Sequence, residues 1–148
     1  MINIRKAHFV DIVAISGRLR EQDEKEIIEA GNSSVAESLR YSLSRSLVSY
    51  CVDIDGIPQA LFGLVPDSLL GETACVWFLG TKEMSKIKKS FVKKSREVVN
   101  YWLTQYSILW NIFPKSYVET CRWLSAMGAE FKEMNEPKGF ILFKLERR

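Results

Sequence analysis

The stretch that decides the fold is residues 73–113, TACVWFLGTKEMSKIKKSFVKKSREVVNYWLTQYSILWNIF. It begins with a near-continuous apolar run, Thr73–Gly80, which is typical of a strand buried on both faces. Ser85 can cap a long helix that runs to Tyr106, and residues 108–113 form a second apolar strand. A strand, a long helix and a strand in this order predict a parallel, right-handed crossover.

The first third of the chain carries mainly helical patterns. Residues 2–5 predict a short strand, and Val10 begins an apolar pattern with helical spacing. The charged segment at residues 19–30 predicts a second helix, because a Gly-Asn pair that favours helix termination follows it. Ser33 and Ser34 can cap a third helix. The sequence therefore predicts one strand followed by two or three helices.

A β-hairpin is predicted next. Residues 47–54 and residues 58–65 are two apolar segments with strand character. They flank Asp55 and Gly56, a dipeptide that is typical of a tight hairpin turn. We therefore expect these two strands to pair antiparallel.

The rest of the chain completes one α/β domain. Residues 116–127 predict a helix, and residues 139–145 predict a closing strand. The whole order predicts a single mixed β-sheet with helices on both faces, in one domain that spans residues 1–148. A chain of 148 residues, of which 47% are hydrophobic and 26% charged, has the composition of a globular protein.

We expect an intracellular, cytoplasmic protein. No run approaches the roughly 18–20 apolar residues that a membrane span needs, and MINIRKAHF has no apolar stretch after its charges, so we expect neither membrane contact nor a secretory signal. Cys51, Cys75 and Cys121 lie in apolar surroundings without C-x-x-C spacing, which predicts reduced, buried thiols and argues against structural zinc. His8 is the only histidine, so we expect neither a metal site nor a Ser-His-Asp triad.

Positive charge gathers in residues 82–96, although the net charge of the chain is only +3. One interpretation is the solvated face of an amphipathic helix, and the other is a site for phosphate groups on a cofactor or nucleic acid. The chain has neither an RNA-binding signature nor zinc-finger spacing, which argues against a nucleic-acid partner. The segment has one acid, Glu83, and seven basic residues: Lys82, Lys86, Lys88, Lys89, Lys93, Lys94 and Arg96.

The element order and the opening segment INIRKAHFVDIVAIS resemble the GNAT acyltransferases, whose first strand and helix have an I-R-x-A start followed by an Asp. Other motifs are similar to a narrower group, the GNAT-like bacteriophage proteins related to internal virion protein A of short-tailed phages. In LREQDEKEI, that group's Arg-x-x-Asp-x-x-Glu pattern corresponds to Arg20, Asp23 and Glu26. The resemblance implies a GNAT fold. The remaining matching motifs are SLVSYCVDIDG, ALFGLVPDSLLGETACVWFLGT, ILWN, CRWLSAMGAEF and FKLERR.

The resemblance also implies where a cofactor would bind. GNAT enzymes have a pyrophosphate loop with the pattern Q/R-x-x-G-x-G/A between the fourth strand and the long helix, where glycines let backbone N–H groups approach the phosphates. Here the segment is GTKEMSKIKKS, and its single glycine leaves the glycine cradle missing. If acetyl-CoA binds nonetheless, the resemblance assigns it to Gly80, Thr81, Lys82, Ser85 and Lys86.

The resemblance further implies a position for the general acid. Many GNAT enzymes carry a Tyr four residues before the Gly that ends the fourth helix. In this chain that Gly is Gly128 and the acid position is Leu124, which cannot donate a proton. The adjacent Trp123 is not a useful acid at neutral pH. Tyr117, about two helical turns earlier, is the remaining candidate, and its alternative interpretation is a surface Tyr at a helix start.

The candidate general bases are Asp23 and Glu26, which GNAT topology would place near the acceptor cleft. Their spacing puts both on one helix face with Arg20. The three residues could form a patch that binds a substrate or a partner. They could equally form a solvated ladder of ion pairs.

Three functions are compatible with the sequence. The first, which the sequence favours, is a phage- or prophage-encoded, non-catalytic GNAT-like protein of virion assembly, in the host cytoplasm or in the virion, with phage structural or assembly proteins as partners. The second is an acetyl-CoA-dependent N-acetyltransferase of an unknown amine, because loss of one acid lowers the rate without abolishing acyl transfer. The third is a protein that binds another anion through the lysine-rich helix. The oligomeric state stays open.

Overall fold

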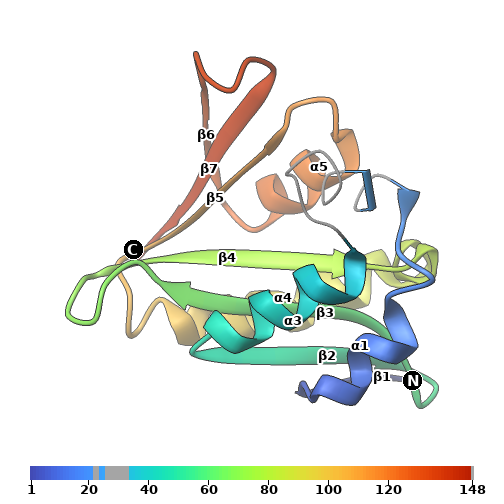
Figure 1. The fold of residues 1–148 in the computed structure, drawn as a ribbon. Coiled ribbons are helices and arrows are strands. Elements are labelled where there is room, and N and C mark those ends of the chain that lie inside the picture. Colours follow the sequence, from blue (N-terminus) through green and yellow to red (C-terminus); the bar gives the residue numbers. More distant parts are fainter. Residues whose placement is uncertain (22–23, 26–33, 148) are drawn as a thin grey trace. The chain divides into compact units, whose positions relative to one another are not determined.

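The computed structural model describes residues 1–21, 24–25 and 34–147. These residues contain one mixed seven-stranded sheet with the strand order β1-β2-β3-β4-β5-β7-β6 (Figure 1). The prediction of a single mixed sheet with helices is therefore confirmed. The strands are β1 (Ile2–Lys6), β2 (Val48–Ile54), β3 (Ile57–Pro66), β4 (Thr73–Gly80), β5 (Ile108–Pro114), β6 (Glu130–Glu133) and β7 (Phe140–Glu146).

The helices lie close to their predicted bounds, with three differences. The long helix ends at Trp102, four residues before the predicted end at Tyr106. The prediction that Ser85 caps the long helix is wrong, because Ser85 lies inside a short 3₁₀ helix, where its hydroxyl donates to the Lys82 carbonyl at 2.8 Å. The prediction that a helix begins at Leu19 is also wrong, because Leu19 forms an antiparallel bridge with Thr81. The described helices are α1 (Phe9–Ile15), α3 (Val35–Arg45), the 3₁₀ helix η1 (Lys82–Ile87), α4 (Lys88–Trp102) and α5 (Val118–Ala126).

The chain divides into two compact units, and each is described by itself. The N-terminal unit comprises Met1–Val65 and Trp77–Lys88, and the C-terminal unit comprises Pro66–Val76 and Lys89–Arg148. The first half of β4 belongs to the C-terminal unit and its second half to the N-terminal unit. A single domain over residues 1–148 stays a prediction.

The hairpin of the N-terminal unit is the one that the sequence predicts. β2 and β3 pair antiparallel up to Ile54 opposite Ile57, which leaves two residues for the turn. These are Asp55 with φ 52° and Gly56 with φ 83°, and two positive φ angles are the signature of a turn that matches the twist of the strands. β1 adds to this hairpin by pairing antiparallel with β2.

The core of the N-terminal unit is built from one face of α1, one face of α3 and the central residues of β2 and β3. In α3 the apolar side chains that face the core follow helical spacing, as the sequence predicts. In α1 the prediction that the apolar pattern begins at Val10 is wrong, because Val10 is 70% exposed and Ile12 and Ile15 face the core instead. Trp77 and Leu79, from the second half of β4, pack against it. The buried members are Ile12, Ile15, Leu19, Leu39, Cys51 and Leu61.

Replacing Ser34 by alanine is expected to lower the free energy of unfolding by about 1 kcal/mol. Ser34 is the N-cap of α3, and its Oγ accepts the backbone N–H of Glu37 at 3.1 Å. Urea unfolding measures the change. Ser44→Ala is the control, because its hydroxyl donates to the Tyr41 carbonyl within the same helix. A loss for Ser34→Ala no larger than for this control would contradict the capping role.

The C-terminal unit contains the predicted parallel pair. β4 and β5 pair in parallel from Thr73 opposite Ile108 to Cys75 opposite Trp110. The chain passes between these strands through α4, so the strand, helix and strand order of residues 73–113 forms a parallel crossover as predicted. β5 also pairs antiparallel with β7.

β6 is a strand that the sequence did not predict. It has four residues, of which only Phe131 is a large apolar residue, and it pairs antiparallel with β7 at the edge of the sheet. Phe131 pairs with Phe143, and its ring lies 6.4 Å from that of Phe113. Short, charged edge strands are common because they discourage pairing with other chains, and such strands leave almost no apolar periodicity to detect.

Candidate functional site

The candidate cofactor site is the turn at residues 80–86, which lies within the N-terminal unit. Three backbone N–H groups in it are already bonded. Thr81 donates to the Gln59 carbonyl at 2.9 Å, Glu83 to the Thr81 hydroxyl at 3.3 Å, and Met84 to the Thr81 carbonyl at 3.2 Å. A phosphate that used these donors would have to displace the bonds that hold the turn together.

The space next to Gly80 is filled by packed side chains and is not open to a ligand. A Cβ atom at this position would lie 3.1 Å from Met84 Cγ and 3.2 Å from the ring of Phe78. Met84 is buried, so its side chain fills the space over the glycine. The turn therefore uses the small size of its single glycine to accommodate a methionine.

The other predicted cofactor residues lie in the same turn and are exposed, except for the buried Thr81. Lys86 pairs with Glu83 at 2.7 Å, and both side chains face solvent. Such a pair contributes little to stability, but it places a carboxylate beside the lysines. The structure thus brings Lys82, Ser85 and Lys86 together next to an acid that would repel a pyrophosphate.

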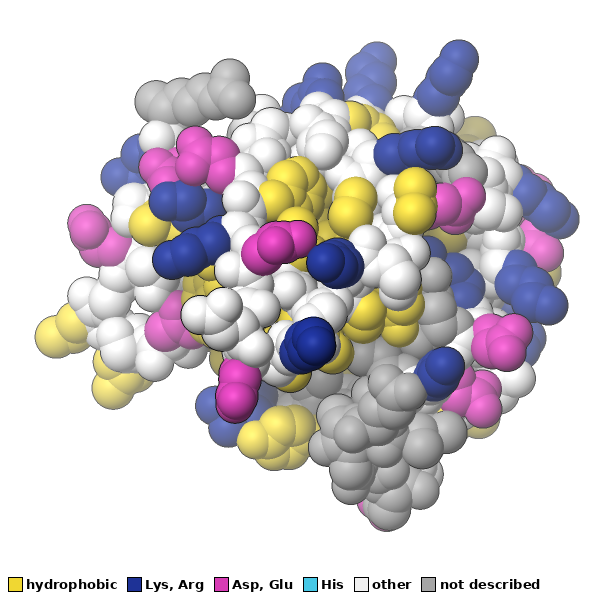
Figure 2. All heavy atoms as spheres, turned by 90° about the horizontal axis from the view of Figure 1, so that it is seen from above, with side chains coloured by type: hydrophobic (Ala, Val, Ile, Leu, Met, Phe, Trp, Pro, Cys, Tyr) yellow, Lys and Arg dark blue, Asp and Glu magenta, His cyan; other side chains and the backbone are white. Residues whose placement is uncertain are grey.

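Basic side chains continue from this turn along α4. Four of them in the C-terminal unit are exposed, and Arg96 donates to the Ala126 carbonyl. Figure 2 shows basic side chains with acidic side chains among them on the face that it draws. The exposure of the side chains on α4 fits the interpretation as a solvated face, and the interpretation as a phosphate site stays a prediction. The four are Lys89, Lys93, Lys94 and Arg96.

A buried polar cluster that the sequence analysis missed supports the turn. Gln59 Oε1 accepts the Thr81 hydroxyl at 2.6 Å and Arg18 Nη1 at 3.0 Å, and Arg18 also donates to the Pro58 carbonyl at 2.7 Å. Gln59 and Thr81 are both buried. One signal was available, since Gln59 is a polar residue within an otherwise apolar strand. Buried polar groups of this kind rigidify a site when their bonds are made.

Arg20 lies beside the same turn. Its backbone N–H donates to the Gly80 carbonyl at 2.9 Å, and its guanidinium lies 5.7 Å from the centre of the Phe78 ring. Both contacts are in the N-terminal unit. The remaining members of the predicted patch, Asp23 and Glu26, lie outside the described residues. The patch, and the role of these two acids as bases, stay predictions.

The residue at the general-acid position on α5 is a buried leucine, which cannot act as an acid. Gly128, with φ 88°, ends the helix, and Ala129 N–H bonds back to the Leu124 carbonyl at 3.0 Å. Leu124 is 2% exposed, so the position that GNAT enzymes give to Tyr carries a core side chain here. Trp123 stacks on Phe91 with ring centres 5.6 Å apart.

Tyr117 is the N-cap residue of α5 and is half-buried. Its backbone N–H donates to the Pro114 carbonyl at 3.0 Å, and its carbonyl accepts Cys121 N–H at 3.1 Å. Tyr117 therefore begins the helix, as the alternative interpretation expects, but it is half-buried rather than exposed on the surface. Its role as an acid stays a prediction.

The N-terminal unit contains a second polar cluster. It joins strands β1 and β2 to helix α1 and does not face a turn. Arg5 donates to both carboxylate oxygens of Asp11, at 3.0 and 2.9 Å, and to both of Asp53, at 2.7 and 3.2 Å. Both acids are buried. Burial acts to raise the pKa of Asp11, but the bonds from Arg5 and from His8 N–H outweigh it and hold this pKa below its ordinary value. The cluster is fully paired, which suits structure rather than catalysis.

The cysteines are free, and they differ in burial. Cys51 is buried as predicted, whereas Cys75 and Cys121 are half-buried, so the prediction is wrong for these two. Burial raises the pKa of Cys51 to about 12 and that of Cys75 to about 11. Neither of these two thiols is a reactive nucleophile at neutral pH.

Two further classes of site find no support in the described part of the chain. Its residues include no group of three or more His, Cys, Asp or Glu side chains that could hold a metal ion. Among its helices, none has the length and apolar character needed to cross a membrane.

Comparison with known proteins identifies the fold. No family model matches the chain, and no curated protein matches its sequence. Solved structures do match. The chain is similar to a GNAT-family acetyltransferase from Bacillus anthracis, with a TM-score of 0.70, 11% identity, and coverage of 98% of this chain and 94% of that one.

Two further structures agree. One is AAC(6′)-Ib in complex with ribostamycin and coenzyme A, with a TM-score of 0.70, 14% identity, and coverage of 99% of this chain and 93% of that one. The other is the GNAT domain of S. lividans PAT, with a TM-score of 0.71, 12% identity, and coverage of 99% and 90%. The chain therefore has the GNAT acetyltransferase fold, as the resemblance predicts. At these identities the likeness establishes the fold alone.

Proposed function

We propose that this chain is a non-catalytic protein that uses the GNAT fold as an interaction scaffold. The observation that carries the proposal is the turn after β4, where Met84 is packed over Gly80 and the N–H groups of Glu83 and Met84 are bonded to Thr81. Coenzyme A needs such a turn to present open N–H groups to its pyrophosphate. Here two of the N–H groups are already bonded within the turn, and the N–H of Thr81 is bonded to the Gln59 carbonyl.

Leu124 supports the proposal independently. A buried leucine at the acid position cannot protonate a leaving thiolate. The resemblance of several motifs to those of GNAT-like bacteriophage proteins favours a phage- or prophage-encoded protein of virion assembly. Phage structural or assembly proteins would then be its partners, in the host cytoplasm or in the virion.

Calorimetric titration with acetyl-CoA tests the proposal. We expect no saturable heat from this chain, because the anion would have to break the bonds of the turn and face Glu83. AAC(6′)-Ib, which binds coenzyme A in its solved structure, is the positive control. Saturable binding that is lost in Lys82→Ala and Lys86→Ala variants would overturn the proposal.

The alternative is an acetyl-CoA-dependent N-acetyltransferase that acts on an unknown amine. The exposed ammonium groups of Lys82 and Lys86 favour it, since they could hold a pyrophosphate outside the turn. Acyl transfer depends mainly on bringing the thioester and the amine together, so the missing acid would lower the rate without abolishing it. Release of free coenzyme A in the presence of spermidine or an aminoglycoside, above the rate without protein, would favour this alternative.

A further inference from the structure

The loop between β3 and β4 carries an apolar tip that touches nothing. Leu69 and Leu70 are 101% and 98% exposed, whereas Leu47, the other exposed leucine among the described residues, is 59% exposed. Two adjacent, fully exposed leucines on an ordered turn are unusual, because scattered apolar side chains are the normal case. Such a pair of exposed leucines can bury apolar surface by docking onto another molecule.

Hydrogen bonds fix the two ends of this loop. The Asp67 carboxylate accepts the Thr73 hydroxyl at 2.6 Å and the indole N–H of Trp110 at 2.7 Å. On the other side, the Glu72 carbonyl accepts the N–H of Ser107 at 2.8 Å. The leucines are thus presented by a loop whose base is fixed, which reduces the entropy lost on binding.

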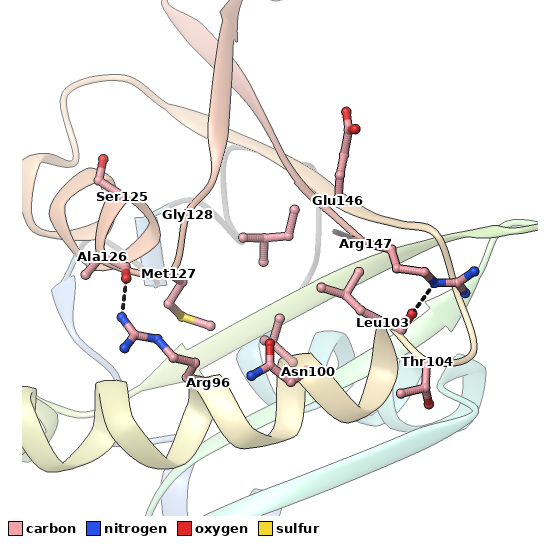
Figure 3. A pocket seen from close by; sticks show the side chains of 12 residues that line it. Arg96, Asn100, Leu103, Thr104, Ser125, Ala126, Met127, Gly128, Glu146 and Arg147 are labelled. Atoms are coloured by element: carbon pink, nitrogen blue, oxygen red, sulfur yellow. Dashed lines mark hydrogen bonds between the residues drawn. The ribbon is translucent and has the colours of Figure 1, made fainter.

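The same unit carries a hollow of about 560 Å³ between α4, the end of α5 and the end of β7 (Figure 3). Part of its lining is apolar, supplied by side chains from all three elements. An apolar lining of this size can accept one or two leucine side chains. The apolar residues are Val99, Leu103, Met127 and Leu145.

Two arginines lie on opposite sides of the hollow, as Figure 3 shows. Arg96 donates to the Ala126 carbonyl, and Arg147 Nε donates to the Leu103 carbonyl at 2.6 Å. Within the described residues these are their only side-chain bonds, so most of their donors remain available. The one acid of the lining, Glu146, pairs with Lys144 and points away from the hollow.

We propose that the loop at residues 67–72 of one copy of this chain docks into the hollow of a second copy. The two surfaces are complementary, because the leucines meet an apolar lining while the acids that flank them, Asp67 and Glu72, meet two arginines. This self-association goes beyond the proposed function, since it does not depend on whether the turn after β4 binds coenzyme A.

The loop and the hollow are neighbours, which permits a reciprocal exchange. Ser107 links them, since its N–H donates to the Glu72 carbonyl of the loop and its carbonyl accepts Arg147 N–H at 2.9 Å. Two copies related by a two-fold axis can therefore each insert a loop into the other. Such an isologous contact closes as a dimer.

Sedimentation velocity over concentrations from about 1 μM to about 1 mM tests the proposal. We expect the full chain to form dimers reversibly. We expect the dimer dissociation constant to rise by at least about 30-fold in the double variant Leu69→Ser/Leu70→Ser and in the variant Asn100→Asp. Asn100 lines the hollow and its side chain has no hydrogen bond among the described residues, so its substitution spares the fold. Matched controls are Leu47→Ser, at an exposed leucine in the N-terminal unit, and Ser90→Asp on α4.

Mixing the two variants gives the decisive result. The double leucine variant keeps an intact hollow and Asn100→Asp keeps an intact loop, so a mixed dimer retains one of the two contacts. We expect the mixture to associate more tightly than either variant alone. A chain that stays monomeric throughout, a dimer that resists both changes, or a mixture no tighter than its parts would each overturn the proposal.

Discussion

Replacing Arg5 by methionine is expected to lower the free energy of unfolding at neutral pH by about 3 kcal/mol or more. Arg5 is the shared partner of Asp11 and Asp53, whose side chains are only 4% and 11% exposed. Without it, two buried carboxylates face each other with no cation between them. Breaking a buried ion pair costs more than the pair contributes, because the remaining charge cannot regain its hydration.

The loss should depend on pH with a definite sign. The pKa of Asp11 is held below its ordinary value in the folded chain, so the stability that Asp11 contributes is present above about pH 4 and is lost as the pH falls further. In the methionine variant the bonds from Arg5 are lost, while burial and the single bond from His8 N–H remain. The pKa of Asp11 therefore rises, and the folded variant gains protons on acidification. The difference between the two chains should therefore shrink from pH 7 towards pH 4.

Urea unfolding at several pH values measures both effects. Lys6→Met is the matched control, because Lys6 is the next residue of β1 and is exposed. Adding Asp11→Asn and Asp53→Asn to the Arg5 variant should recover part of the lost stability, since the unpaired charges are then gone. A cost for Arg5→Met equal to that of Lys6→Met, or a deficit that grows on acidification, would show that Arg5 is not the partner of these acids.

The Arg5 cluster also illustrates which features local sequence patterns do not contain. The hairpin turn at Asp55 and Gly56 and the crossover at residues 73–113 are set by neighbouring residues, so their periodicity and turn chemistry predict them. Arg5 and Asp53 are 48 residues apart, and they meet only because β1 and β2 pair in one register. Asp11 lies in the segment INIRKAHFVDIVAIS, but nothing in that segment shows that Asp53 will share its partner Arg5.

In the candidate site, too, local sequence predicts the positions of residues but not the contacts between them. Gly80 and the residues after it were located from the sequence, and Leu124 was placed at the acid position by counting from Gly128. Whether the turn is open depends on side-chain packing, and only the structure shows Met84 packed over the glycine. The hollow of the C-terminal unit was also beyond prediction, because its lining comes from three elements that are distant in sequence.

A glycine within β3 gives the second large effect. Replacing Gly63 by alanine is expected to lower the free energy of unfolding by about 2 kcal/mol. A Cβ atom there would lie 2.7 Å from Trp77 Nε1 and 2.9 Å from Ser46 Oγ, both closer than van der Waals contact allows. It would also intrude on the hydrogen bond between these two groups, which is 2.8 Å long. Residues around Gly63 in β3 are buried, which limits how far the strand can shift to relieve these contacts.

A double-mutant cycle separates this clash from the general effect of adding a methyl group to a glycine. Trp77→Phe removes the ring atoms nearest to the new Cβ, so Gly63→Ala should cost clearly less in that background than in the native chain. Gly17→Ala is the matched control in the same unit, since a Cβ atom at Gly17 meets nothing within 4 Å. An equal cost in both backgrounds would mean that the indole does not set the requirement for glycine. In that case the close contact with Ser46 Oγ would account for the cost.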